Sequence, residues 1–391
     1  MSYQHLLLAT VLLASPTLAV ASGTSLSGVK HAWSNDSGGY KGLVKSTQPV
    51  TAMDADADPR IIWSIGTQAK LECTAYSEAV EPAQFILDWT ADILSRKSTV
   101  TARTTSGVSA GQVQGFPYLS VTTSYTMGKP QTIKSYVIDI PFGAIACSHD
   151  EPGHETLVLN HLDYLMKHIE IPYNFNLRKT HRIFLIEVNA QPVGFEQQTV
   201  RRAPEGKLID KRRASLLIPH GPGAFIPVDK ETIETLAFNG TLLQQQMVMR
   251  GAGQTQRFDV QSKDYELYTG SGEVNGKSVN IRFKVPSHSL MGVRTASSGL
   301  AQKLAQQTER RPITLPVYNP SIHQQGPTNH VSELTSKLPN GGYMLQEAYG
   351  PQSRKTTRNA KGHLLTATSP LGPSTMETTR IFAKDYPRPK K

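Results

Sequence analysis

The sequence predicts an α+β protein of two domains, each an antiparallel sheet with helices packed on it. Two observations carry this prediction. A β-hairpin pattern followed by a helical pattern occurs twice, at residues 118–170 and 264–310. The chain also has 391 residues, which is long enough for two ordinary domains and their flanking segments. A duplicated architecture is a hypothesis that rests on the order of elements, because the two halves share little residue identity.

The chain begins with the pattern of an export signal. Residues 1–21, MSYQHLLLATVLLASPTLAVA, contain no Lys, Arg, Asp or Glu, and they end in the small-x-small motif Ala19-Val20-Ala21. We therefore predict a cleaved signal peptide, a periplasmic or secreted protein, and no transmembrane segment after cleavage. Residues 22–59 are rich in Gly, Ser and Asp and show little periodicity, so we expect an irregular arm there.

The first predicted domain covers residues 60–172. Runs of β-branched and aromatic residues indicate strands, and apolar residues at helical spacing indicate two helices, the first opened by Pro82. The expected strands are Arg60–Ile65, Lys70–Tyr76 and Ser98–Thr105, then a hairpin of Tyr118–Thr126 and Thr132–Cys147; the expected helices are Glu81–Arg96 and Glu155–Ile169. This order is that of an antiparallel sheet covered by helices.

The run YVIDIPFGAIACS, at residues 136–148, precedes the second of these helices. With the order of elements over residues 60–170, it resembles the PsbP-like and DcrB-like group of exported α+β domains. The resemblance implies a mostly non-enzymatic binding or accessory domain. It contains no signature motif and therefore no catalytic residues to transfer.

The second predicted domain covers residues 173–310, after a break at Ile171-Pro172. Its expected elements are strands at His181–Ala190, Ser215–Pro219 and Leu242–Met249, a helix at Asp229–Asn239, a hairpin at Asp264–Val285 turning at Asn275-Gly276, and a helix near Val293–Arg310. Residues 311–391 are rich in Pro, Gly, Asn, Ser and Thr, and we expect a mostly irregular, flexible basic tail.

Cys73 and Cys147 are the two cysteines of the chain. In an oxidising compartment an even pair most simply forms one disulfide, which here would close a loop of about 75 residues. Two separate buried thiols are the alternative. Nothing in the local sequence marks either cysteine as an activated nucleophile.

The net charge of +10 is unevenly distributed. Residues 351–391 hold nine Lys and Arg against two acids, whereas the preceding 350 residues are nearly balanced. A polyanion-binding surface is therefore an alternative function, with the tail and a basic run, Arg201, Arg202, Lys211, Arg212 and Arg213, as candidates. Aromatic residues do not interleave with the basic runs, so sequence-specific nucleic-acid recognition is not supported.

Two weak motifs keep a hydrolase as another alternative. Gly107-Val108-Ser109-Ala110-Gly111 matches the G-x-S-x-G pattern, but the following residues lack the helix that a nucleophile elbow requires. His149 and His154 are candidate metal ligands around a charged elbow, although the histidines of the following helix are spaced too widely for one ion. The preferred interpretation of both is structural.

The sequence therefore favours an exported, non-enzymatic binding protein with no cofactor and no metal. We expect its partner to be another protein or an envelope component. An accessory protein and a toxin-neutralising, immunity-type protein are two versions of this hypothesis.

Overall fold

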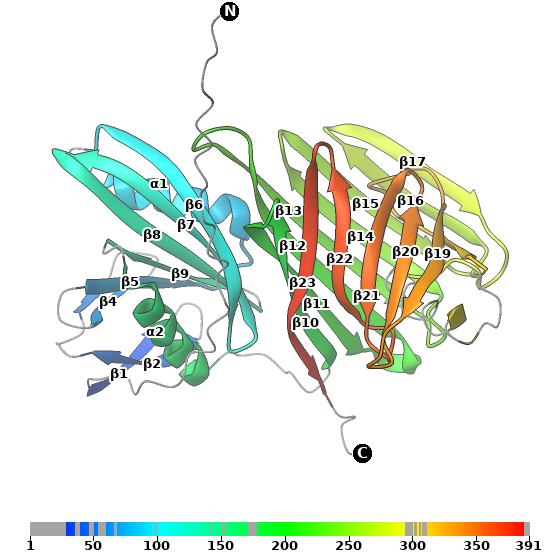
Figure 1. Cartoon of the computed structure of the whole chain (residues 1–391), viewed down its shortest axis with the longest axis horizontal. Helices are drawn as coiled ribbons and strands as arrows, with labels where there is room; N and C mark the ends of the chain where they lie inside the picture. Colours follow the sequence, from blue (N-terminus) through cyan, green and yellow to red (C-terminus); the bar gives the residue numbers. More distant parts are fainter. Residues whose placement is uncertain are drawn as a thin grey trace, which may run out of the picture.

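The computed structural model describes residues 29–35, 40–46, 51–53, 60–65, 69–97, 100–141, 143–150, 153–170, 178–293, 300, 303–304, 306 and 311–386. Strands dominate these residues, and two α-helices of 14 residues each accompany them. The predicted α+β class is therefore wrong, because strands make up most of the described residues and form two antiparallel sheets, so the protein is mostly β (Figure 1). The predicted signal peptide, residues 1–21, lies outside the described residues, and so does the predicted domain boundary at 172.

The first sheet has seven antiparallel strands. Their order is β3-β4-β5-β9-β8-β7-β6. Their bounds are Thr51–Met53 (β3), Arg60–Ile65 (β4), Ala69–Tyr76 (β5), Ala102–Val113 (β6), Phe116–Met127 (β7), Lys129–Ile140 (β8) and Gly143–His149 (β9). The single long strand predicted for Thr132–Cys147 is thus two strands, β8 and β9, which pair with each other.

The two helices lie on opposite faces of this sheet. Helix α1, Pro82–Ser95, buries Ile86 and Trp89 against side chains of β7 and β8. Helix α2, Glu155–His168, buries Leu162 and Leu165 in the core that contains both cysteines. Both helices were predicted from their apolar periodicity, with ends that differ by no more than one residue. Neither helix, and no other helix among the described residues, is both long enough and apolar enough to cross a membrane.

The predicted disulfide is confirmed. Cys73 and Cys147 are register partners on the adjacent strands β5 and β9, with their Cα atoms 4.1 Å apart. Both side chains are fully buried beneath α2. The bond therefore joins the N-terminal half of the first sheet to the hairpin that precedes the second helix.

The segment 22–59 is more regular than predicted. Strands β1, Val29–Asn35, and β2, Tyr40–Ser46, form a separate two-stranded sheet, and β3 joins the first large sheet. Val44 of β2 is 1% exposed and belongs to the core under α2. These short strands contain Gly, Ser and Lys, so apolar and polar residues do not alternate clearly enough in them to predict strands.

The second sheet has fourteen antiparallel strands in the order β17-β16-β15-β14-β13-β12-β11-β10-β23-β22-β21-β20-β19-β18. The bounds of its first eight are Arg178–Val188 (β10), Gln191–Arg202 (β11), Leu208–Pro219 (β12), Phe225–Leu236 (β13), Leu242–Gly251 (β14), Gln254–Ser262 (β15), Leu267–Val274 (β16) and Lys277–Lys284 (β17). The other six are Ile313–Val317 (β18), Thr328–Lys337 (β19), Tyr343–Tyr349 (β20), Gln352–Arg358 (β21), Leu364–Leu371 (β22) and Ser374–Asp385 (β23).

Two predictions for this half of the chain are therefore wrong. The region from 311 onward is not an irregular tail, because it forms β18 to β23, and β23 pairs along its length with β10. The predicted helix Asp229–Asn239 is part of strand β13, since its backbone pairs with β12 on one side and β14 on the other. Tertiary pairing here overrides a short helical pattern. The helix predicted near 293–310 falls largely outside the described residues.

This sheet curls until one part of it faces another. Figure 1 shows β19 to β23 in front of the layer formed by β11 to β17. The two edge strands do not pair with each other. Instead, Met291 bridges Val317 of β18 to Thr241, the residue that precedes β14. The inward face at one end is apolar, where Tyr268, Ile281 and Tyr318 pack together. The curl therefore encloses an interior that is independent of the first sheet.

Strand β12 connects the two large sheets through its outward face. Arg213 Nη1 donates to Asp139 Oδ1 of β8 at 2.6 Å, and its Nη2 donates to the carbonyl of Val80. Asp229 of β13 accepts the backbone N–H groups of Ala83 and Gln84, both at 3.2 Å. Helix α1 has no side-chain cap of its own, so the second sheet supplies the missing acceptor for its first turn.

Candidate binding site

A polar belt lines the interior of the curled sheet. Because side chains alternate across a strand, residues two apart share a face, and register aligns these faces between neighbouring strands. On one wall the belt consists of Glu196, Gln198, Asp210, Arg212, Lys230, Glu234 and Gln245, from β11 to β14. On the other wall it consists of His330, Ser332, Glu347, Arg354 and Arg358, from β19 to β21. The interior is thus built to hold charge, which is unusual for a buried surface.

A pocket of about 400 Å³ lies between these walls. Glu196 and Arg212 line it from one side, and Tyr349 and Arg354 line it from the other. Its remaining lining residues are Val293, Asn319, Pro351, Gln352, Ser353, Ser369, Pro370, Leu371 and Met376. Leu371 is 42% exposed, which places an apolar side chain at the opening. The lining mixes apolar side chains with charged and polar ones, and a concave site that combines the two kinds of group can hold a small molecule.

Arg354 is held by a buried ionic cluster. Glu347, which is completely buried, accepts hydrogen bonds from Arg354 Nε at 3.1 Å and from Arg358 Nη2 at 2.9 Å. Arg354 Nη2 donates to the hydroxyl of Tyr349 at 2.8 Å, and the guanidinium carbon lies 4.9 Å from the centre of that ring. The pKa of Glu347 lies well below its usual value because the two guanidinium groups and His330 outweigh the effect of burial. Glu347 is therefore a fixed anion that orients two cations.

The opposite wall holds Arg212 in a similar way. Its Nη2 lies 2.7 Å from Glu234 Oε1, an atom that also accepts a hydrogen bond from Gln245 Nε2 at 3.2 Å. Asp210 accepts from Gln198 Nε2 at 2.7 Å and lies 3.9 Å from Arg212 Nε. Burial raises the pKa of Glu234, against the opposing effect of the Arg212 guanidinium. Burial, together with the neighbouring charge of Arg212, lowers the pKa of Lys230 to about 8.

His330, Ser332 and Glu347 meet in this cluster but do not form a nucleophilic relay. Ser332 Oγ lies 3.0 Å from His330 Nε2, and Glu347 Oε1 lies 3.3 Å from the same nitrogen. A serine–histidine–carboxylate relay needs the hydroxyl and the carboxylate on different ring nitrogens. Among the described residues, Nδ1 of His330 has no hydrogen-bond partner. All three residues are completely buried, so the arrangement is that of a packed polar core.

The two candidate centres from the sequence lie in the first sheet, away from this pocket. Ser109 stands in the middle of β6, where its hydroxyl lies 2.5 Å from that of Ser120 on β7. A regular paired strand differs from the strand-to-helix turn of a nucleophile elbow. His149 is buried on β9 and stacks on Tyr136, whereas His154 is at the N-terminus of α2. Across the described residues, no three or more His, Cys, Asp or Glu side chains gather in a metal-binding arrangement.

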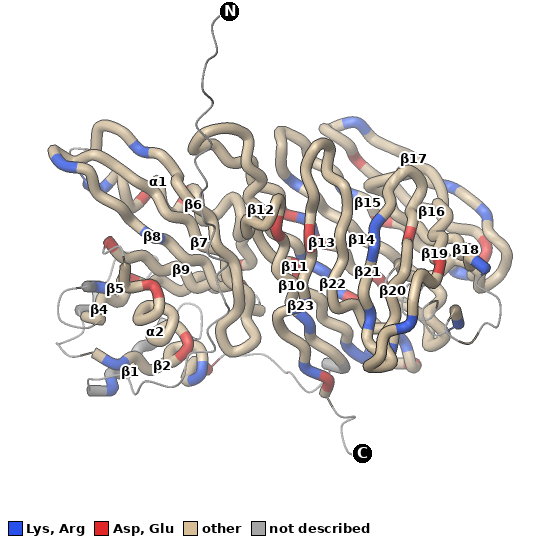
Figure 2. The backbone as a smooth tube through the Cα atoms, viewed as in Figure 1, with Lys and Arg blue, Asp and Glu red and all other residues tan. Residues whose placement is uncertain are grey.

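Strand alternation separates the basic run instead of presenting it as one surface. Arg212 points into the curled sheet, whereas Lys211 and Arg213 occupy the opposite face, with Glu231 and Asp139 as partners. Arg201 and Arg202, at the end of β11, likewise belong to opposite faces. Figure 2 shows acidic positions interspersed with basic ones along these strands. Arg212 was predicted as part of a basic surface, whereas its side chain lies on the interior face of the curled sheet beside Glu234.

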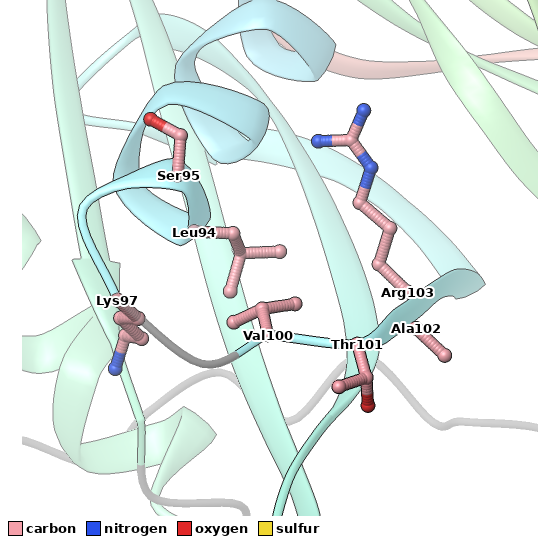
Figure 3. Close-up of a pocket in the computed structure, with 7 residues that line it drawn as sticks. All are labelled: Leu94, Ser95, Lys97, Val100, Thr101, Ala102 and Arg103. Carbon is pink, nitrogen blue, oxygen red and sulfur yellow. The ribbon is translucent and has the colours of Figure 1, made fainter.

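A second hollow, of about 450 Å³, lies beside the end of α1. Figure 3 shows Leu94 and Val100 near each other within it, Arg103 opposite, and Lys97 pointing away. Lys97 is already engaged, since its Nζ lies 2.7 Å from Asp150 and 3.1 Å from the hydroxyl of Tyr125. We place the candidate site in the curled sheet, whose pocket brings Glu196, Arg212 and Arg354 together.

Three charged or aromatic residues of the pocket, Glu196, Tyr349 and Arg354, were not among the candidates predicted from the sequence. Tyr349 and Arg354 fall in the segment that was interpreted as irregular, and Glu196 is more than 150 residues away from them in the chain. One signal was present: Tyr343–Tyr349 and Gln352–Arg358 flank Gly350-Pro351, which is a strand–turn–strand pattern. The pattern is hard to recognise because polar residues occur on the interior face of these two strands as well as on the exterior face, so apolar and polar residues do not alternate.

No protein-family model matches this sequence, and the comparison with curated proteins gives no significant match. Several solved structures are similar to it, among them the following two. One is a β-barrel-like protein of the domain of unknown function DUF1849 from Brucella abortus, with 10% identity and a TM-score of 0.41 over 54% of this chain and 99% of that one. The other is the cyanobacterial PsbP of Synechocystis sp. PCC 6803, with 10% identity and a TM-score of 0.28 over 39% of this chain and 95% of that one. At this identity the likenesses concern the backbone alone.

Proposed function

We propose that this chain is an exported, non-enzymatic binding protein that holds a small amphipathic molecule in the pocket of the curled sheet. The observation that carries this proposal is the composition of the pocket. Val293, Tyr349 and Met376 supply apolar surface, while Arg212 and Arg354 converge from opposite walls. A volume of about 400 Å³ lies in the range of sites for small molecules.

Export is supported by two features. The first 21 residues have the pattern of a signal peptide, and Cys73 is bonded to Cys147. Structural disulfides persist in oxidising compartments such as the periplasm and the extracellular space. The expected result of N-terminal sequencing of the mature protein is a first residue at Ser22. Recovery of the intact N-terminus from the cytosolic fraction would contradict export.

A binding role fits the polar belt better than a hydrolytic one. Glu347 and Glu234 are each occupied by arginines, and the hydroxyl and carboxylate around His330 share one ring nitrogen. Such satisfied networks rigidify a site and orient its polar groups. An accessory role in the envelope follows more directly from a small-molecule pocket than toxin neutralisation, which needs an exposed docking surface.

The test uses Nile red, an uncharged dye that fluoresces in apolar surroundings, with decanol as an uncharged competitor. We expect saturable binding to the mature protein and displacement by decanol. Ser369→Trp fills the pocket from β22 and should weaken dye binding at least tenfold. Met344→Trp, on the outward face of β20 where Met344 is 38% exposed, is the matched control and should bind like the wild type.

Equal dye affinity in the wild type and in Ser369→Trp would show that the pocket is not the binding site. Thermal melts of both variants are required, because adding a large side chain can destabilise a packed region. Met376→Trp, which fills the same pocket from β23, provides a second variant if Ser369→Trp does not fold.

A further inference from the structure

The arginines that line the pocket indicate which charge its ligand carries. Arg212 and Arg354 are the basic residues of its lining, and Glu196 is its acidic one. The two guanidinium groups approach from β12 and β21, which are far apart in the sheet order. The carboxylates that hold the two arginines, Glu234 and Glu347, are completely buried behind the lining, so the guanidinium groups are the parts of these ion pairs that reach the pocket.

Each arginine is fixed before any ligand arrives. Arg354 uses Nε and Nη2 in its bonds to Glu347 and Tyr349, and within the described residues its Nη1 donates no recorded hydrogen bond. Arg212 is held on its far side by Glu234, a residue that is completely buried. A guanidinium has five N–H donors in a planar fork, so an arginine held by one edge still presents donors on another. Preorganised donors cost little conformational entropy when a ligand binds.

Glu196 lies close enough to both arginines to interact with their charges. Burial lowers the pKa of Arg212 and of Arg354, but nearer acidic partners and then Glu196 raise it by more. Each guanidinium is held by a buried carboxylate and still has N–H donors that this pairing does not use. An anionic group of a ligand would accept hydrogen bonds from those donors, and an apolar portion of the same molecule would cover Val293 and Met376.

Resting on the proposed function, we propose that the ligand of this pocket is an amphiphile with an anionic head group, which Arg212 and Arg354 bind together. The head group belongs to the carboxylate or phosphate class, whose planar or tetrahedral oxygens match the donor fork of arginine. The cluster of Glu347, Arg358 and Tyr349 positions Arg354 for this contact and does not touch the ligand through Glu347.

The experiment compares ligands that differ in the head group alone. Displacement of Nile red is measured with decanoate, with methyl decanoate and with decylamine on the unmodified protein. We expect decanoate to bind at least tenfold more tightly than methyl decanoate, because a charge-assisted contact is lost in the ester, and decylamine to bind most weakly. Decyl phosphate should bind at least as well as decanoate and identifies the preferred member of the class.

Variants then assign the preference to the arginines. In Arg354→Gln the advantage of decanoate over its ester should fall to less than threefold, and Arg354→Lys should retain part of it. Lys355→Gln changes the neighbouring exposed residue on the other face of β21 and should leave the advantage unchanged. If Arg354→Gln does not fold, raised salt on the wild type provides the second measurement, and it should weaken decanoate without affecting the ester.

The outcomes separate the two proposals. If the dye, decanol and the ester bind but decanoate binds no more tightly, the pocket is a ligand site and the anionic head group is wrong. If none of these molecules binds, the proposed function itself is wrong. A decanoate advantage that persists in Arg354→Gln and in Arg212→Gln would also overturn the assignment.

Discussion

Arg213 of the second sheet and Asp139 of the first form an ion pair, with Nη1 and Oδ1 2.6 Å apart, that links the two halves of the chain. Asp139 is 2% exposed, so this pair is shielded from solvent. Arg213 also donates to the carbonyl of Val80, just before α1, and Asp229 satisfies the first turn of that helix. These polar contacts lie beside an apolar cluster in which Phe195 and Leu217 of the second sheet pack against Ile86 of α1, so both kinds of contact join the two sheets.

Replacing Arg213 with Met should strongly destabilise the protein. The change leaves the carboxylate of Asp139 and the carbonyl of Val80 buried without their donor, and breaking a buried pair typically costs about 3–5 kcal/mol. Urea unfolding should show this loss in the free energy of unfolding. The double variant Arg213→Met/Asp139→Leu removes both charges and should recover most of it. A single variant within about 1 kcal/mol of the wild type would contradict this role.

The same pair should produce a pH dependence of stability. Burial, opposed by the charge of Arg213, raises the pKa of Asp139 to about 6. The folded state therefore binds this proton more tightly than the unfolded state, in which the pKa is near 3.9. Protonation of Asp139 therefore stabilises the folded state fully below about pH 4, and this stabilisation is lost as the pH rises through about 6. The corresponding change in the free energy of unfolding is about 3 kcal/mol.

Denaturant curves at pH 4 to pH 7 for the wild type and Asp139→Asn provide the measurement. The difference in unfolding free energy between the two should change across this window. Asp259→Asn, on the solvent-exposed face of β15, is a control that should run parallel to the wild type. In Arg213→Met the transition should move above pH 6, because the cation that lowers the pKa is gone.

His161 should make the opposite contribution. It is 4% exposed on the buried face of α2, where its Nδ1 accepts a hydrogen bond from Trp63 Nε1 at 3.4 Å. Burial, and then the charge of Lys45, lower the pKa of His161 to about 4. Neutral His161 therefore contributes to the free energy of unfolding above about pH 6.5. This contribution, of about 3 kcal/mol, is lost as the pH falls towards about 4. The variant His161→Gln should lose this acid sensitivity, whereas His220→Gln, at an exposed turn, should keep it.

Removing the disulfide should destabilise the first sheet. Cys73 and Cys147 are 74 residues apart, and closing a loop of this length stabilises the folded state by about 4 kcal/mol in the chain-entropy description. We expect the double variant Cys73→Ala/Cys147→Ala to lose about this amount in urea unfolding. Reductant should lower the free energy of unfolding of the wild type and leave that of the double variant unchanged. If reductant present during unfolding does not change the free energy of unfolding of the wild type, the disulfide does not stabilise the protein in this way.

How much of this structure the sequence predicts depends on whether buried faces are apolar. Helix α1 and helix α2 were predicted because Trp89, Leu162 and their neighbours recur every three to four residues on a buried side. The disulfide followed from cysteine number and compartment. Strands β18 to β23 were missed because their inward positions are polar, as Ser332, Glu347 and Arg358 show. Hydrophobic periodicity carries no signal where charges pair inside.

The candidate site could not be predicted for a second reason. Its arginines come from strands whose neighbourhood is set by the curl of the sheet, and Arg212 and Arg354 are 142 positions apart in the chain. Local patterns indicate which face of a strand a residue occupies. They do not indicate which distant strand faces it across an interior.

The C-terminal strands should be required for the second sheet to fold. Because β23 pairs with β10 over its whole length, a chain that ends at Gly350 leaves β10 as an unpaired edge and removes the donors to Glu347 from Arg354 and Arg358. We expect the urea m-value to fall, because less surface is buried, and limited proteolysis to cleave β10 to β17. A chain that ends at Tyr386 retains β23 and should behave like the full-length protein. If the chain that ends at Gly350 resists protease as well as the full-length protein, then β21, β22 and β23 are not required for the rest of the second sheet to fold.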